Sequence, residues 1–222
     1  LSLLYSVRLC KKTEIMKIFI KICGITSIND ACASVSSGAD AIGLMMYKKS
    51  PRSISLEKAV EISKAISKKV LPIMVFANQT KDHVSTCLDA VPEAIPQFHG
   101  SEDSQFCSSF KRDFIKAIQV NKKTNFDQIS KDFSKAKMLL FDTKDKNLLG
   151  GTGKTFHWGL ITKELKKPFI LAGGLNSGNI ESALTEVSCS GIDVSSGVES
   201  YLGKKDPDKI RKFVNKVRGF DG

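Results

Sequence analysis

Short apolar runs rich in β-branched residues alternate along the chain with longer stretches whose apolar residues recur at helical spacing. The first pattern is typical of buried strands and the second of amphipathic helices. We predict eight strands, at Lys17–Ile22, Ala41–Met45, Leu71–Phe76, Ala94–Gln97, Phe114–Val120, Met138–Phe141, Phe169–Ala172 and Gly191–Val194. We predict eight helices that follow them in turn, at Ser27–Ser37, Leu56–Lys68, Lys81–Ala90, Ser104–Phe110, Phe126–Phe133, Trp158–Leu165, Asn179–Val187 and Pro207–Arg218.

The ends of several predicted helices carry residues that suit those positions. Thr26 or Ser27, and later Ser55, stand where a helix N-cap is expected, and an acidic residue follows each in the first turn. Gly38 suits the position just after a helix, and Pro207 suits the first turn of the last helix. These signals support the proposed boundaries.

Strict alternation of strands and helices predicts a parallel sheet with right-handed crossovers, the α/β class. Eight units in a chain of 222 residues fit a single (β/α)8 TIM barrel, with eight parallel strands inside a ring of helices. The alternative is an open doubly wound sheet. That fold carries a G-x-G-x-x-G fingerprint after its first strand, and the sequence has none there.

One domain is expected, because a chain of this length can bury one sizeable core. Residues 16–222 are predicted to form the catalytic barrel. Residues 1–15 are predicted to be an N-terminal extension, disordered or non-native, because Met16 directly precedes the first strand pattern. The apolar run in this extension comes before its basic residues, the reverse of a secretory signal. No apolar run approaches the roughly 20 residues of a membrane-spanning helix.

The chain is basic, with 34 Lys and Arg against 23 Asp and Glu and a net charge of +11. Such a balance suits nucleic acid, an anionic membrane or a small anionic substrate. The lysines are scattered, and the chain has one Trp and three Tyr, so a nucleic-acid interface is not favoured. A solvated lysine-rich surface explains most of the charge.

The six cysteines form no C-x-x-C pair and lie near no pair of histidines, so a zinc site is not predicted. Their wide spacing suits free thiols in a reducing cytoplasm. We therefore expect a cytoplasmic protein without a metal site.

In TIM barrels the reactive side chains stand at the carboxyl ends of the strands. The first strand ends with Lys21, Ile22 and Cys23, and alternation directs Lys21 and Cys23 into the barrel and Ile22 toward the helices. A thiol beside an ammonium can be biased toward the thiolate, which accepts a proton. A small buried core residue is the alternative for Cys23.

Two further strand ends carry charge. Asp142 follows three apolar residues of the sixth strand and could be a general acid facing the base, or a cap that orders its loop. Arg52 lies in a proline-stiffened loop after the second strand. It could bind a carboxylate through both nitrogens of one edge, or it could be a solvated loop charge.

Gln97 and His99 share a face at the end of the fourth strand and could contact a sugar, although a hydrogen-bonded structural histidine is equally consistent with the pattern. The segment 150–155 ends like a nucleotide-binding P-loop. The first glycine of that motif would fall on Leu148, which excludes the match. A glycine loop that folds over bound substrate suits this segment better.

The loops after the seventh and eighth strands are rich in glycine and serine. Glycine lets backbone N–H groups approach an anion closely, and in TIM barrels this pair of loops commonly binds phosphate. Two tight turns that need glycine are the alternative. The predicted phosphate-binding residues are Gly173, Gly174, Ser195, Ser196 and Gly197.

Seven segments together resemble the phosphoribosylanthranilate isomerase family. They read KICGIT at 21–26, SPR at 50–52, QFHG at 97–100, LLFDT at 139–143, GGTGKTF at 150–156, LAGGLNSGNI at 171–180 and DVSSGVE at 193–199. The resemblance implies an Amadori rearrangement of N-(5-phosphoribosyl)anthranilate to a 1-deoxyribulose phosphate, the third step of tryptophan synthesis from chorismate. It also implies that the enzyme needs no cofactor.

The resemblance implies a role for each matched residue. Asp142 would protonate the furanose ring oxygen as general acid, and Cys23 would remove the proton from ribose C2 as general base. Arg52 would hold the anthranilate carboxylate. Asp193 would contact a sugar hydroxyl, and the glycine and serine loops would hold the phosphate. The full set of substrate-binding residues would be Lys21, Arg52, Gln97, His99 and Asp193.

The sequence departs from the family pattern at His157, where an aspartate usually precedes the tryptophan. This affects the loop after the sixth strand and not the acid itself. Two other functions are considered. A phosphosugar epimerase would need metal ligands, and His83, His99 and His157 form no convincing set; a nucleic-acid binder would need clustered basic and aromatic residues. The expected partner is a small phosphorylated anionic substrate, without nucleic acid or membrane, and the enzyme is expected to be a monomer or homodimer.

Overall fold

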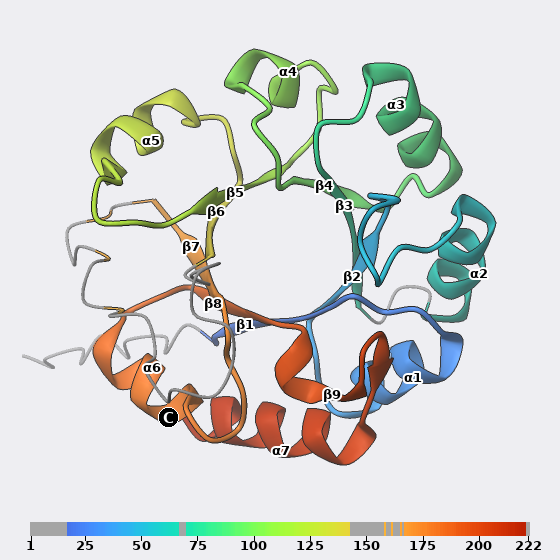
Figure 1. The fold of residues 1–222 in the computed structure, drawn as a ribbon, viewed down its shortest axis with the longest axis vertical. Coiled ribbons are helices and arrows are strands. Elements are labelled where there is room, and N and C mark those ends of the chain that lie inside the picture. The colour runs from blue at the N-terminus through green and yellow to red at the C-terminus, as the bar shows by residue number, and fades with distance from the viewer. Residues whose placement is uncertain are drawn as a thin grey trace, which may run out of the picture.

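Eight parallel strands close into a barrel in the computed structural model, which describes residues 17–66, 70–142, 158, 161, 165 and 167–220. Figure 1 looks down the barrel and shows the helices as an outer ring. The strands pair in sequence order, and β8 pairs with β1 to complete the circle. They are β1 Phe19–Cys23, β2 Ala41–Met45, β3 Leu71–Phe76, β4 Ile95–Phe98, β5 Ile115–Gln119, β6 Met138–Asp142, β7 Phe169–Ala172 and β8 Gly191–Val194. The predicted TIM barrel is confirmed, and the open sheet is excluded.

Seven α-helices lie within the described residues, and their ends agree with the predicted ones to within a few residues. They are α1 Ile28–Ser36, α2 Leu56–Ile66, α3 Lys81–Ala90, α4 Ser104–Ser108, α5 Phe126–Asp132, α6 Ile180–Glu186 and α7 Pro207–Arg218. Most of the predicted helix Trp158–Leu165 lies outside the described residues, as does the extension predicted for residues 1–15.

An unpredicted hairpin stands between β8 and α7. A 3-10 turn, η2 Ser196–Val198, leads into β9 Glu199–Tyr201, which pairs antiparallel with β10 Lys204–Lys205. These strands of three and two residues are too short for a periodic pattern to reveal them. The hairpin is important for the site described below.

The predicted helix ends are confirmed. Ser27 accepts a hydrogen bond from the Asp30 amide at 3.1 Å, and Ser55 accepts one from the Lys58 amide at 3.2 Å. Gly38 has a φ of +91°, a left-handed conformation that glycine adopts without strain. These caps fix where the helices begin and end, and therefore how the strand ends are spaced around the barrel.

Side chains alternate between two apolar cores. Outward-facing residues such as Ile22, Phe98 and Phe141 pack against the helices in one large cluster. Inward-facing residues form a separate cluster inside the barrel, made of Ala41, Ile73, Ile115, Ala117, Leu140, Ile170 and Ala172. Polar side chains replace this inner cluster toward the carboxyl ends of the strands, where Lys21 and Gln97 are fully buried.

The first strand and the last helix are joined at the opposite face of the barrel, where the strands begin. Asp40 accepts hydrogen bonds from Lys17 Nζ at 2.9 Å, the Ile20 amide at 2.9 Å and Arg218 Nη2 at 2.6 Å. Arg218, the last residue of α7, also donates from Nη1 to the Ile18 carbonyl at 2.6 Å. The last helix is thereby fastened to the first strand.

This arrangement gives an acid-dependent stability. Partial burial alone would raise the pKa of Asp40, but the hydrogen bonds from Lys17, Arg218 and the Ile20 amide outweigh it and hold the pKa below its ordinary 3.8. A carboxyl with a depressed folded-state pKa stabilises the fold above its unfolded-state pKa, and this stability is lost as the pH falls through the folded-state value. We expect Asp40→Asn to lower the free energy of unfolding by about 1–3 kcal/mol at neutral pH, since it weakens hydrogen bonds to charged groups.

Urea unfolding as a function of pH measures this effect. The difference between Asp40→Asn and the unmodified protein should shrink as the pH falls below about 4. Asp113→Asn is the matched control, because Asp113 pairs with Lys137 on the surface and should change stability by less than about 0.5 kcal/mol. A difference for Asp40→Asn that does not change with pH would contradict the assignment.

Candidate active site

The inward-facing polar residues gather at the carboxyl ends of the strands in three groups. One group contains Lys21, Cys23 and Asp193. A second contains Gln97, His99 and Asp142, and a third joins Arg52 to the hairpin. The structure therefore brings the predicted site residues to one face of the barrel, as the strand directions require.

Lys21 and Asp193 lie side by side because β1 and β8 are neighbours. Lys21 pairs in register with Asp193, and Lys21 Nζ lies 2.9 Å from Asp193 Oδ1. Lys21 is fully buried and Cys23 is 7% exposed, while Ile22 packs in the outer core. The predicted orientations of all three β1 residues are confirmed.

The expected bias of Cys23 toward the thiolate is wrong. Burial raises the pKa of the Cys23 thiol above its ordinary 9.0, and the Lys21 ammonium offsets only part of this rise. The ammonium is already paired with Asp193, whose charge opposes its effect on the sulfur. Burial alone would lower the pKa of Lys21, but Asp193 and Cys23 reverse this and raise it. Lys21 is therefore a charged donor next to the buried sulfur of Cys23.

Gly43 makes room for Lys21 and Cys23, although it was not among the predicted site residues. It stands opposite Cys23 in the β1–β2 register. A Cβ atom at Gly43 would lie 2.6 Å from Cys23 Sγ and 3.1 Å from Lys21 Nζ. A glycine in the middle of an apolar strand often marks such a close approach, and this was the available signal.

Gln97, His99 and Asp142 form a chain of polar contacts across the ends of β4 and β6. Gln97 Nε2 lies 3.2 Å from His99 Nδ1, and His99 Nε2 lies 3.4 Å from Asp142 Oδ2. Asp142 is the last residue of β6 and is partly exposed. The buried Gln97 Oε1 has no hydrogen-bond partner among the described residues, so it can still accept one.

A buried ion pair fixes the backbone next to His99. Lys116 Nζ lies 3.0 Å from Glu102 Oε2 and donates to the Gly100 carbonyl at 2.7 Å. Glu102 accepts from the Gly100 amide at 2.9 Å and from the Asn78 amide at 2.7 Å. The loops after β3 and β4 are thus tied together beneath His99. A lysine inside the apolar β5 was the only sequence signal for this pair.

Arg52 is held by a carboxylate from the hairpin. Its Nε and Nη2 donate to the two oxygens of Glu199, both at 2.6 Å, and Lys205 Nζ lies 3.0 Å from Glu199 Oε1. The pKa of Arg52 is raised by this pairing. Burial alone would raise the pKa of Glu199, but Arg52 and Lys205 lower it below its ordinary 4.5. Arg52 is therefore an oriented group and not a solvated loop charge.

The bidentate contact with Glu199 uses one edge of the Arg52 guanidinium. Arg52 Nη1 donates no hydrogen bond to any residue in the described part of the chain. A guanidinium has five N–H donors, so a second carboxylate can bind at the remaining edge. Glu199 and Lys205 were not among the predicted site residues, because their contacts depend on a hairpin that leaves no periodic pattern in the sequence.

The two predicted phosphate loops are built around glycine. Gly173 and Gly174 have φ values of +99° and +69°. A Cβ atom at Gly197 would lie 1.9 Å from the Leu175 carbonyl oxygen, so the turn after β8 touches the loop after β7. Ser195 and Ser196 stand in that turn. Glycine is required at position 197 on steric grounds, and the two loops contact each other there.

Gly24 joins the arginine to this region. A Cβ atom at Gly24, where φ is +74°, would lie 2.4 Å from Arg52 Cδ and 3.1 Å from Ser195 Oγ. Arg52 and Ser195 therefore pack against the same glycine at the end of β1. The third group of site residues and the predicted phosphate loops form one continuous surface.

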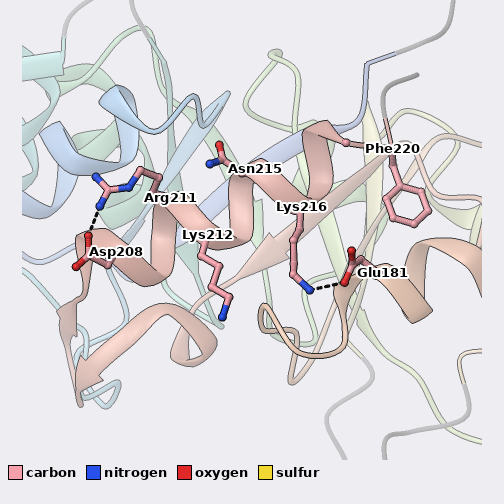
Figure 2. A pocket seen from close by; sticks show the side chains of 8 residues that line it. Glu181, Asp208, Arg211, Lys212, Asn215, Lys216 and Phe220 are labelled. Carbon is pink, nitrogen blue, oxygen red and sulfur yellow. Dashed lines mark hydrogen bonds and ion pairs between the residues drawn. The ribbon is translucent and has the colours of Figure 1, made fainter.

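Other features of the described residues carry less chemistry. Within them no three His, Cys, Asp or Glu side chains gather as metal ligands, and no helix is long and apolar enough to cross a membrane. His157 and the segment 150–156 lie outside them. A groove between α6 and α7 on the outer wall contains the ion pairs Asp208–Arg211 and Glu181–Lys216 and leads to Phe220, away from the strand ends (Figure 2).

Gly43 provides a test of this geometry. We expect Gly43→Ala to lower the free energy of unfolding by about 1–3 kcal/mol, because the new methyl group overlaps Cys23 Sγ inside a packed barrel. Gly219→Ala is the control, since a Cβ there would have its nearest neighbour at 3.4 Å. Chemical unfolding of both variants measures the difference. Equal stability of the two would show that the space beside Cys23 is not restricted.

The sequence matches a known family over most of its length. The model of the family described as N-(5'phosphoribosyl)anthranilate (PRA) isomerase matches residues 20–216. A relative from Pseudomonas fluorescens (strain SBW25), named N-(5'-phosphoribosyl)anthranilate isomerase, is 44% identical over 202 residues. The alignment covers 91% of this chain and 96% of the relative.

Solved structures agree with the sequence match. Phosphoribosyl anthranilate isomerase from Thermotoga maritima has a TM-score of 0.83 at 37% identity, covering 91% of this chain and 99% of that one. A phosphoribosyl anthranilate isomerase in complex with reduced 1-(o-carboxyphenylamino)-1-deoxyribulose 5-phosphate has a TM-score of 0.80 at 34% identity, with the same coverage of each chain. The barrel, the strand-end residues and these matches together show that the chain belongs to the N-(5'-phosphoribosyl)anthranilate isomerase family, enzymes of tryptophan biosynthesis.

Proposed function

We propose that this enzyme converts N-(5-phosphoribosyl)anthranilate to 1-(2-carboxyphenylamino)-1-deoxyribulose 5-phosphate, with Asp142 as general acid and Cys23 as general base, at the third step from chorismate to tryptophan. One observation carries the proposal. A thiol on β1, a carboxylate on β6, and two glycine-rich turns meet at the same end of one barrel. An acid and a base on different strands can act on two atoms of one bound sugar.

The reaction begins with proton donation by Asp142. Its carboxyl group protonates the furanose ring oxygen, and the C1–O bond breaks to give an open-chain Schiff base. His99, whose Nε2 lies 3.4 Å from Asp142 Oδ2, orients this carboxyl group. Hydrogen bonding by a neighbour keeps a general acid in one direction relative to its substrate.

Cys23 acts second, as the thiolate that forms when the thiol gives its proton to solvent, and removes the proton from ribose C2. The resulting enolamine gains a proton at C1 and loses the proton of its C2 hydroxyl to give the ketone, so substrate and product are isomers and no cofactor is needed. The raised pKa of Cys23 makes its thiolate a strong base once formed. The buried Lys21 ammonium, 2.9 Å from Asp193, stabilises that thiolate by its charge.

Residues at the carboxyl ends of the strands would bind the substrate. The remaining edge of Arg52 would take the anthranilate carboxylate, and the turns at Gly173–Gly174 and 195–197 would take the phosphate. Lys21, Gln97, His99 and Asp193 would contact the sugar hydroxyls. The ligand of the solved relative supports separate carboxylate and phosphate sites, because it carries one carboxyl group and one phosphate.

The cellular setting is proposed on simpler grounds. An enzyme that works on a free anionic metabolite suits the cytoplasm, and the five free cysteines of the described residues agree with a reducing compartment. One solved relative is titled as monomers generated from the dimeric Thermotoga maritima enzyme. We propose that this chain acts as a monomer or a homodimer.

Complementation tests the activity directly. Expression of this chain in a strain that lacks phosphoribosylanthranilate isomerase should restore growth without tryptophan. A strain deficient in a phosphosugar epimerase serves as the specificity control and should not be rescued. Failure to support growth, with soluble folded protein present in the cells, would refute the proposed activity.

Two substitutions test the proposed chemistry. Cys23→Ser and Asp142→Asn should each lower kcat by roughly 10²–10⁴-fold, because each removes one proton-transfer group. KM should change little, since neither residue is proposed to hold the anthranilate carboxylate or the phosphate. Steady-state kinetics, together with thermal unfolding to confirm an intact fold, measures both. Near-native kcat in either variant would remove that residue from the mechanism.

A further inference from the structure

Lys205 is a buried cation to which no role has been assigned so far. It lies on β10 and is 1% exposed. Its ammonium donates to the Ser195 carbonyl at 3.1 Å, lies 3.4 Å from Ser195 Oγ, and donates to Glu199 Oε1 at 3.0 Å. One side chain therefore contacts the turn proposed for phosphate and the carboxylate that holds Arg52.

The hairpin that carries Lys205 is fixed in place. Thr26 Oγ1 donates to the Gly203 carbonyl at 2.7 Å, and Lys204 Nζ lies 2.8 Å from Asp30 Oδ1. The Asp206 amide donates to the Val198 carbonyl at 2.9 Å. These contacts tie the hairpin to the beginning of α1 and to η2, so Lys205 is held in a defined position.

The charges of this cluster do not cancel. On the Glu199 carboxylate itself, Arg52 and Lys205 contribute two positive charges against one negative charge, which leaves one net positive charge. Lys209 Nζ, which donates to the Glu199 backbone carbonyl at 2.7 Å, adds a further positive charge nearby. Lys21 and Asp193 beside them form a neutral pair. A bidentate Arg52–Glu199 pair alone would be neutral and would attract a second carboxylate weakly. Lys205 thus supplies the excess positive charge at the Glu199 carboxylate.

Burial of Lys205 disfavours the charged form of its side chain. Burial lowers the pKa of Lys205 below its ordinary 10.5, although Glu199 acts in the opposite direction. A buried lysine is costly unless its charge is used or paired. Glu199 is shared with Arg52, so this pairing is incomplete, and a ligand anion would complete it.

We propose that Lys205 is a positioning residue that joins the two anion-binding parts of the site. It shares Glu199 with Arg52 and leaves one net positive charge for the substrate carboxylate, and it holds Ser195 in the turn that receives the phosphate. The inference rests on the proposed function, because it takes Arg52 as the carboxylate-binding residue and Ser195 as part of the phosphate turn.

Two ligands that differ only in the carboxyl group show how much this group contributes to binding. The first is reduced 1-(o-carboxyphenylamino)-1-deoxyribulose 5-phosphate, and the second is the same compound with a phenyl ring that lacks the carboxyl group. The ratio of their dissociation constants, measured by calorimetry, reports how strongly the site prefers the carboxylate. Lys205→Met should reduce this ratio about tenfold, the effect of one lost favourable charge.

Three companion variants sharpen the test. Lys205→Arg keeps the charge and should retain the ratio within about threefold. The double variant Lys205→Met with Glu199→Gln removes one charge of each sign, keeps the net positive charge and should recover part of the ratio. If Lys205→Met does not fold, Lys205→Gln takes its place, because an amide can still donate to the Ser195 carbonyl without carrying charge.

Lys212→Met is the matched control on the neighbouring helix α7. Lys212 is exposed and lines the outer groove between α6 and α7, so its loss should leave the ratio unchanged. A second readout is kinetic: Lys205→Met should raise KM more than it lowers kcat, since the residue acts on binding. Equal weakening of both probes by Lys205→Met, with a lowered unfolding temperature, would mean a merely structural role and would overturn the inference.

These measurements distinguish an error in the proposed function from an error in the inference about Lys205. If the unmodified enzyme binds both probes equally, Arg52 does not hold the carboxylate, and both this part of the proposed function and the inference are wrong. If the unmodified enzyme prefers the carboxylate and Lys205→Met or Lys205→Gln keeps the same preference, the inference alone is wrong. A reduced preference that Lys205→Arg restores would support it.

Discussion

The hydrogen-bonded pairing of β1 with β8 is the constraint on which the site depends. It closes the sheet and places Lys21 beside Asp193, although 172 positions separate them in the sequence. It also brings the end of β1 next to the turn after β8, where Gly24 packs against Ser195 and Arg52. An open sheet would leave these strands at opposite edges, and neither contact could form.

Closure also forces charges into a confined space. Lys21, Asp193, Glu199 and Lys205 are all largely buried near Cys23, and Arg52 is half-buried. Buried charges are costly unless they are paired and hydrogen-bonded, and here each carboxylate contacts at least one cation. Burial raises the pKa of the Cys23 thiol among these charges, and the Lys21 ammonium acts in the opposite direction.

The fold and the orientation of the first site residues could be predicted because they depend on short-range patterns. Alternation along β1 correctly separates Lys21 and Cys23 from Ile22, and the caps at Ser27 and Gly38 follow from local chemistry. The direction of the Cys23 pKa shift could not be predicted in this way, since desolvation depends on what packs around the sulfur in three dimensions.

The supporting residues were beyond prediction for a related reason. Glu199 meets Arg52 across 147 positions through a hairpin whose strands are too short to leave a pattern. Gly43 and the Lys116–Glu102 pair gave only weak signals, an unusual residue inside an apolar strand. Such residues act by contacting other side chains, and a sequence shows their identity without showing their neighbours.

The joining of Arg218 to Ile18 has a consequence for the connectivity of the chain. The Arg218 side chain reaches from the end of α7 to the start of β1, where its Nη1 donates to the Ile18 carbonyl at 2.6 Å, at the face away from the carboxyl ends of the strands. A short linker could therefore join the end of α7 to the start of β1, and new termini could be opened in an outer loop elsewhere without changing the order of strands around the barrel. The contact between β1 and α7 and the candidate active site lie at opposite faces of the barrel. Circular permutation could therefore change where the chain begins and ends without disturbing the active site.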